Sequence, residues 1–165
     1  MAERLSALCT WLSRAAMALA GAGLVLMTAL ITWQVFARYV LRDSPSWTEQ
    51  ASLLALIWFI LLAGAAGVHQ NFHLRLTLLE TSLPKAWSRR LQIVGHFLVL
   101  LFGVMMAASG VELALATRTH ELPALGVSRA VTYIPVALSG ALIAIFSLDR
   151  MVGTLTGRKE KDQWN

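Results

Sequence analysis

The chain has 165 residues, of which 57% are hydrophobic and 14% are charged. Soluble domains carry about 25% charged residues, so this composition excludes an ordinary soluble enzyme and indicates a membrane protein. The net charge of +5 does not indicate nucleic-acid binding, because the basic residues cluster in short segments beside apolar stretches. Basic residues in such places set the topology of a membrane protein.

Four apolar stretches fill most of the chain, at residues 15–37, 51–68, 93–117 and 131–148. A hydrocarbon core of about 30 Å requires roughly 20 helical residues, and only helices or closed barrels satisfy their backbone hydrogen bonds in lipid. The sequence therefore predicts an all-α integral membrane protein with one four-helix transmembrane domain over residues 15–150.

Residues 1–14 are predicted to form an N-terminal interfacial segment, because leucines share one helix face and Trp11 suits the membrane interface. The following apolar run is too long for a signal peptide and has no convincing cleavage site, so we expect it to be retained as the first span. The polar residues 151–165 are predicted to form a flexible cytoplasmic tail.

The distribution of lysine and arginine predicts the topology. Ten of these residues lie in the N-terminal segment, the loop between the second and third spans and the C-terminal tail, and four lie in the other two loops. This bias places both termini in the cytoplasm and turns the first and third loops outward.

The first outer loop ends in a helix start, because Ser46 and Glu49 have the spacing of a capping box. Arg38 ends the first span and Glu49 begins the second, so the two side chains are expected to lie near each other. Their role is left open between closing this hairpin and contacting an outside partner. The candidate partner-contact residues at the outward end are Arg38, Trp47, Glu49, Glu112 and Arg129.

On the inner side, Pro84 is expected to open a helix that is amphipathic and interfacial. Short interfacial amphipathic helices of this kind fix the depth and tilt of a membrane protein. The candidate interface anchors are Trp11, Trp87, Arg89 and Arg90.

Several chemistries have no support in the sequence. The middle of each span has no charged residue, and His69 and His73 have no third metal ligand at a supporting spacing. No nucleophile with its base and no phosphate-binding loop is present. The missing midplane carboxylate disfavours a small self-sufficient exporter, and the missing pair of facing histidines disfavours the membrane anchor of a redox complex. Both remain as alternatives.

A combination of motifs resembles a known family. The motifs are QVFARYV (34–40), SPSWTE (44–49), GAA (64–66), HL (73–74), ALGV (124–127) and YIPVA (133–137). Together they resemble the small permease subunit of tripartite ATP-independent periplasmic (TRAP) transporters, the DctQ-like family. Two positions depart from the family pattern, since Gln50 and Thr77 stand where acidic residues are frequent.

The resemblance implies a subunit of the bacterial inner membrane that is not itself the pump and is not an enzyme. A large multi-span permease subunit would hold the solute and sodium sites, and a periplasmic solute-binding protein would deliver an organic acid anion such as a dicarboxylate or sialic acid. The small subunit would act as a scaffold in the lipid and offer part of the docking surface. It would hold no cofactor of its own, and no nucleic acid is expected as a partner.

Overall fold

The computed structural model describes the backbone of residues 2–43, 45–80 and 85–156 and the side chains of 7–43, 45–69 and 90–154. Its main elements are four long helices: α1 (Ala2–Phe36), α2 (Ser46–Glu80), α3 (Lys85–Ala116) and α4 (Ala130–Thr156). Each contains a segment that is long and apolar enough to cross a membrane, namely Ala7–Leu41, Ser46–His69, Arg90–Ala116 and Ala130–Thr154. The predicted all-α architecture with four spans is confirmed.

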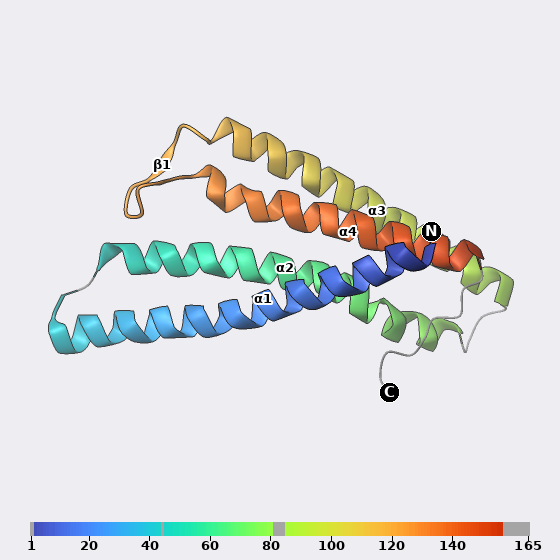
Figure 1. Ribbon diagram of the computed structural model, residues 1–165, viewed down its shortest axis with the longest axis horizontal. Helices are drawn as coiled ribbons and strands as arrows, with labels where there is room; N and C mark the ends of the chain where they lie inside the picture. Colours follow the sequence, from blue (N-terminus) through green and yellow to red (C-terminus); the bar gives the residue numbers. More distant parts are fainter. Residues whose placement is uncertain (1, 44, 81–84, 157–165) are drawn as a thin grey trace.

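The helices form two antiparallel hairpins (Figure 1). Between α1 and α2 lies η1 (Ala37–Leu41), a single wide turn of π-helix that ends at Arg42 in the left-handed conformation. Between α3 and α4 lies a small β-hairpin of β1 (Glu121–Leu122) and β2 (Val127–Ser128). Gly126, with a φ of +63°, closes its turn, which needs the left-handed backbone that glycine adopts without strain.

The two hairpins meet mainly through α2 and α4, with a smaller contact between α1 and α4. Figure 1 shows them converging at the end that holds the N-terminus and separating toward the β-hairpin. We call these the inner and outer ends of the molecule.

Within the second hairpin, small residues bring the backbones of α3 and α4 together. A Cβ on Gly140 would lie 2.5 Å from the Ala107 nitrogen, and a Cβ on Gly110 would lie 2.5 Å from the Ala137 nitrogen. Close backbone approach of this kind is the main way in which helices pack in lipid. The small-residue patches of the third and fourth spans therefore form an internal seam.

The first hairpin packs by a different device. The ring of Phe59 on α2 covers Gly23 on α1 and occupies the space that a Cβ there would need. Farther toward the inner end, Ala65 and Ala66 are fully buried, whereas Gly64 faces open space. Phe59 thus packs directly on the backbone of α1, and the two alanines of α2 are buried within the molecule.

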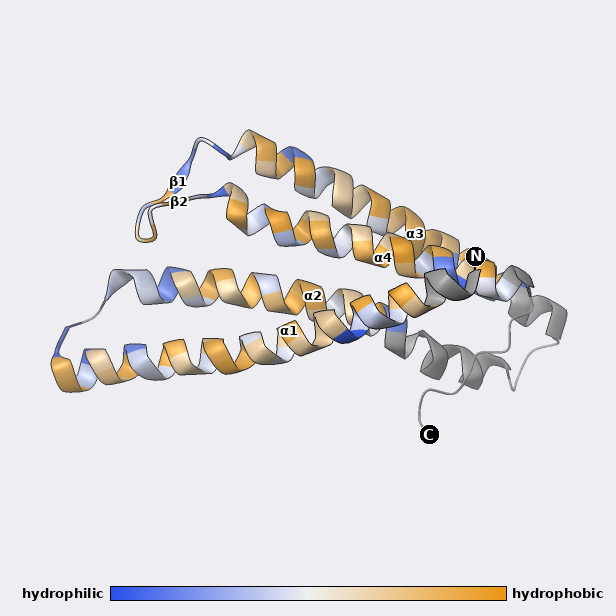
Figure 2. Ribbon diagram, in the orientation of Figure 1, coloured by the Kyte–Doolittle hydropathy of each residue, from blue (hydrophilic) through white to orange (hydrophobic). Residues whose placement is uncertain are grey.

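The outside of the molecule is largely apolar. Only 11–33% of the residues in the most apolar 18-residue stretch of each membrane-spanning segment are buried within the molecule. Figure 2 shows hydrophobic residues along all four helices. Such a surface fits a bilayer or a protein partner, because monomeric soluble proteins rarely expose apolar patches of this extent.

The ends of the helices differ from the sequence-based boundaries. Residues 2–14 are not a separate helix but the first turns of α1, which runs without a break to Phe36. Likewise α3 runs unbroken from Lys85 into the third span, and α4 continues past residue 150 to Thr156. The location of residues 1–14 at the membrane interface stays a prediction. The predicted flexible tail lies outside the described residues from residue 157 onward.

Candidate functional site

The five candidate partner-contact residues all lie at the outer end, three on the first hairpin and two on the second. Arg38 belongs to η1, Trp47 and Glu49 to the first turn of α2, Glu112 to the last turns of α3, and Arg129 precedes α4 directly. All five side chains are exposed. The fold thus places them on one end of the molecule and leaves them accessible. The pairing of Arg38 with Glu49 stays a prediction.

Two hydrogen bonds join the hairpins near this end. The side-chain oxygen of Gln50 accepts a bond of 3.3 Å from the backbone N–H of Ala124, in the turn of the β-hairpin. The indole N–H of Trp58 donates a bond of 3.0 Å to the carbonyl of Val131 at the start of α4. A tryptophan that is buried at least in part usually finds a hydrogen-bond partner for its N–H. The presence of Trp58 in the second span is therefore the one feature of the sequence that indicates the bond to Val131.

The loop that carries Arg129 is held by its own hydrogen bonds. The N–H of Arg129 donates to the carbonyl of His120 at 2.7 Å, and the Ser128 hydroxyl donates to the carbonyl of Arg118 at 2.8 Å. The two arginines of this loop are therefore presented from an ordered backbone. An ordered loop loses less conformational entropy when a partner binds than a flexible one.

The inner end holds a polar cluster that the sequence analysis did not single out. Its buried members come from α1, α2 and α4 and are Cys9, His69 and Asp149. Half-buried Arg150 donates a hydrogen bond from Nη2 to the carbonyl of His69, and the His69 ring lies 4.8 Å from the ring of Phe146. The Cys9 thiol lies within electrostatic reach of Asp149 and Arg150.

This cluster has the chemistry of a structural joint. A buried charge is costly unless it is paired and hydrogen-bonded, and the bond from Arg150 to His69 links α4 to α2 where the hairpins converge. Within the described residues, no group of three or more His, Cys, Asp and Glu side chains is arranged to hold a metal ion. We therefore assign the cluster to the packing of the hairpins.

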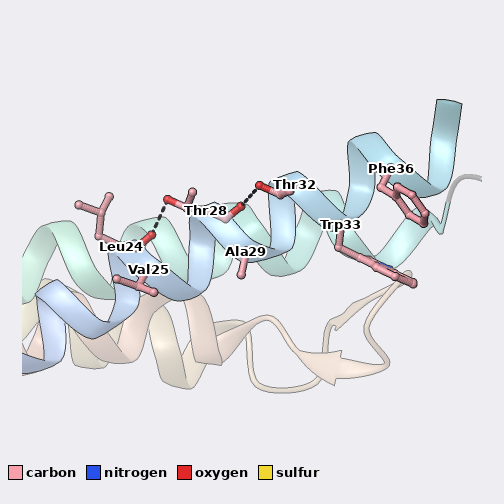
Figure 3. A pocket seen from close by; sticks show the side chains of 7 residues that line it. All are labelled: Leu24, Val25, Thr28, Ala29, Thr32, Trp33 and Phe36. Carbon is pink, nitrogen blue, oxygen red and sulfur yellow. Dashed lines mark hydrogen bonds between the residues drawn. The ribbon is translucent and has the colours of Figure 1, made fainter. Parts of the chain in front are cut away.

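One face of α1 forms a depression of about 690 Å³ that opens away from the rest of the molecule (Figure 3). Large side chains border it and small ones form its floor; the lining residues are Leu24, Val25, Thr28, Ala29, Thr32, Trp33 and Phe36. The hydroxyl of Thr28 donates to the carbonyl of Leu24, and that of Thr32 to the carbonyl of Thr28, both at 2.8 Å. Because both hydroxyls are satisfied by the helix itself, this face is apolar in effect.

The candidate membrane anchors are only partly described. Trp11 is 66% exposed and Arg90 is exposed, as an interfacial role requires. The side chains of Trp87 and Arg89 lie outside the described residues. Anchoring by these four residues stays a prediction.

Comparison with known proteins identifies relatives of this chain. A protein from Haemophilus influenzae described as a TRAP transporter small permease protein is 23% identical over 128 residues, which cover 76% of this chain and 78% of the relative. A second such protein from the same species is 24% identical over 133 residues, covering 80% and 82%. The sialic acid TRAP transporter small permease protein of Vibrio cholerae is 22% identical over 125 residues, covering 76% and 72%.

The family comparison extends along most of the molecule. Residues 27–157 match the family described as tripartite ATP-independent periplasmic transporters, DctQ component. The matched region includes the outer part of the first span, the other three spans and both outer loops. Members of this family are transporter subunits of the inner membrane and not enzymes. The chain belongs to the DctQ component family of the TRAP transporters.

Proposed function

We propose that this small permease subunit supports sodium-coupled uptake of an organic acid anion. In this proposal a large permease subunit holds the solute and sodium sites, and a periplasmic binding protein delivers the solute. One relative is named for sialic acid, which is an organic acid. The small subunit contributes membrane-embedded bulk and contact surfaces.

The placement of charge supports this division of labour. Transport pathways through a membrane are marked by ionisable residues inside the spans. Here the middle of each span has no charged residue, and the hydroxyls of Thr28 and Thr32 are bonded to their own helix. The solute pathway is therefore assigned to the partner subunit.

The α1 face of Figure 3 is the observation that carries the proposal. Small residues such as Ala29 lie between large ones such as Trp33, which gives the relief into which the side chains of another helix pack. The large permease subunit is the membrane partner with such helices. We assign the α1 face to the contact with it.

Co-purification tests this contact. Ala29→Trp fills the depression, whereas Ala108→Trp makes the same change at an exposed position on α3. We expect Ala29→Trp to reduce the amount of large permease that co-purifies with the tagged small subunit, while Ala108→Trp retains it. Equal retention by both variants at normal abundance would reject the α1 face as the contact.

The outer end is proposed to face the periplasm and to contribute to docking of the binding protein. Glu49 is exposed there, so its substitution disrupts no buried contact. Glu49→Arg should lower solute uptake while membrane abundance stays normal, and Glu49→Gln, which keeps the size of the side chain, should lower it less. Unchanged uptake by Glu49→Arg would remove this residue from the docking surface.

A further inference from the structure

A proline interrupts the hydrogen bonding of α4 near its outer end. Pro135 lies inside the helix, beyond its first turn, and its side chain is fully buried. Because proline has no backbone N–H, the carbonyl four residues earlier, that of Val131, loses its donor within the helix. In a membrane-spanning helix, a carbonyl freed in this way is satisfied by a side chain, by water or by a neighbouring helix.

Trp58 of α2 supplies the replacement donor. Its indole N–H donates to the carbonyl of Val131 at 3.0 Å. The indole has one donor and no acceptor, so this bond uses all of its hydrogen-bonding capacity. The bond that α4 lacks at Pro135 and the bond that it receives from α2 therefore concern the same carbonyl oxygen.

The first turn of α4 and the β-hairpin before it are joined by hydrogen bonds, and we call residues 118–134 the outer unit. The N–H of Ala130 donates to the Ser128 hydroxyl at 3.2 Å, and the N–H of Thr132 donates to the carbonyl of Arg129 at 3.0 Å. Sharp bends in helices occur mostly at proline. A bend at Pro135 would therefore move the β-hairpin and Arg129 together, and the bond from Trp58 opposes this movement.

Gln50 adds a second bond from α2 to the outer unit. Its side-chain oxygen accepts from the N–H of Ala124 at 3.3 Å. This bond uses only the oxygen of the amide, and a carboxylate at the same position offers an equivalent acceptor. Two bonds at separate points, on Ala124 and on Val131, restrain both the position and the orientation of the outer unit, whereas one bond would leave rotation about it free.

We propose that Gln50 and Trp58 are positioning residues that hold the outer unit against bending at Pro135 and so keep Arg129 oriented for the periplasmic binding protein. This inference rests on the proposed docking of that protein at the outer end. A loop that is held in place before its partner arrives loses less conformational entropy on binding. Both positioning side chains are half-buried, so they act through the outer unit and not by contact with the partner.

A double-mutant cycle, measured by thermal unfolding of the full-length chain in detergent, tests the link between Trp58 and the proline. Pro135→Ala supplies an N–H that bonds the carbonyl of Val131 within the helix. We expect Trp58→Phe to lower the melting temperature of the parent more than that of the Pro135→Ala protein, because the carbonyl keeps a donor in the second case. Trp33→Phe, at an exposed position on α1, should have the same effect in both backgrounds. Equal effects of Trp58→Phe in the two backgrounds would overturn the link.

Amide hydrogen exchange tests the second bond without a change at the proline, so it decides the matter even if Pro135→Ala fails to fold. Gln50→Leu should speed exchange in residues 118–134, and Gln50→Glu, which keeps the acceptor, should not. Gln34→Leu makes the same change at a half-buried position on α1 and is the matched control. Parental exchange in Gln50→Leu would overturn the restraint by Gln50.

Binding of the transporter's own periplasmic binding protein to the complex of both membrane subunits tests the positioning role. Gln50→Leu and Trp58→Phe should each raise the dissociation constant by up to about tenfold, the range expected when one hydrogen bond no longer holds the competent orientation. The amount of large permease that co-purifies should stay at the parental level. Gln50→Glu should bind as the parent does, and Pro135→Ala should restore binding to the Trp58→Phe protein.

The outcomes separate this inference from the proposed function. If the parent complex binds the binding protein and the Gln50→Leu and Trp58→Phe complexes bind it equally well, the positioning role is overturned and the docking stands. If the parent complex does not bind it, the proposed docking fails and the positioning role fails with it. The melting and exchange measurements use the small subunit alone, so they still decide whether α2 holds the outer unit.

Discussion

The seam between α3 and α4 makes a sharp prediction about Gly140. An added Cβ would lie 2.5 Å from the Ala107 nitrogen and 2.8 Å from the Gly103 oxygen, whereas ordinary van der Waals contact begins at 3.4 Å. Both neighbours are backbone atoms and cannot rotate away. Gly140→Ala therefore forces the two helices apart by about 1 Å, and a gap of that order removes a quarter to a half of the dispersion energy of each contact. We expect a loss of about 1–3 kcal/mol in the free energy of unfolding, the usual cost of overpacking.

Thermal unfolding in detergent, followed by size-exclusion chromatography with fluorescence detection, measures this effect. Gly21→Ala is the matched control, because a Cβ on Gly21 meets no atom within 4 Å. Alanine is favoured over glycine in a helix by about 0.5–1 kcal/mol, so the control should be neutral or stabilising. The same chemical change is thus expected to lower the melting temperature at Gly140 and to leave it unchanged or raise it at Gly21.

The reasoning would be refuted if Gly140→Ala were as stable as Gly21→Ala. That result would mean that the backbones of α3 and α4 are farther apart than the structure places them. The larger change Gly110→Leu adds a second check on the same seam, since a Cβ there would lie 2.5 Å from the Ala137 nitrogen.

Three further predictions concern the ends of the molecule. Arg150→Met should lower the free energy of unfolding by about 1.5–3 kcal/mol, because it removes a charged hydrogen bond to the carbonyl of His69. Arg118→Met is the control at an exposed position and should have little effect in the same melting assay. Trp58→Phe should cost about 0.5–1.5 kcal/mol through loss of the bond to Val131, and a melting temperature equal to that of the parent would argue against that tie. Alkaline phosphatase should be active when it is fused after Asp43 or Thr119 and inactive after Asn165; the reverse pattern would invert the predicted orientation.

The number and class of the helices were predictable from the sequence, because each apolar run has the length that a bilayer requires. The helix ends were predicted less well. The hydrophobic signal stops where the bilayer stops, but the backbone hydrogen bonds of a helix continue into the polar sequence beyond it. For this reason α4 runs to Thr156, well beyond the predicted end of its span.

The sequence has small residues grouped in the second, third and fourth spans, but it does not show which face of each helix they occupy. Gly64 and Gly140 both stand in such patches, yet Gly140 lies against a neighbouring backbone and Gly64 faces open space. In a soluble helix, amphipathic periodicity shows which face turns inward. In a membrane helix both faces are apolar, so the rotation about the helix axis is set by packing alone.

The position of a candidate site residue was predictable from the sequence only where the order of the spans determines at which end of the molecule the residue lies. Residues at the outward ends of antiparallel spans lie at one end of the molecule, and the structure has Arg38, Glu49 and Arg129 there. Their role as partner contacts stays a prediction. The inner cluster joins His69 to Arg150 across 81 residues of sequence. That contact depends on how the two hairpins cross, and no local sequence motif predicts the crossing.

The two ends of the molecule are fastened in different ways, and this difference bears on function. At the inner end buried polar groups and the bond from Arg150 to His69 hold the hairpins together. At the outer end the hairpins separate, and the described side-chain bonds across the gap are those of Gln50 and Trp58. A body that is joined at one end and spread at the other presents its outer loops to its surroundings. This arrangement suits a subunit whose proposed task is to grip the bilayer and to offer surfaces to partners.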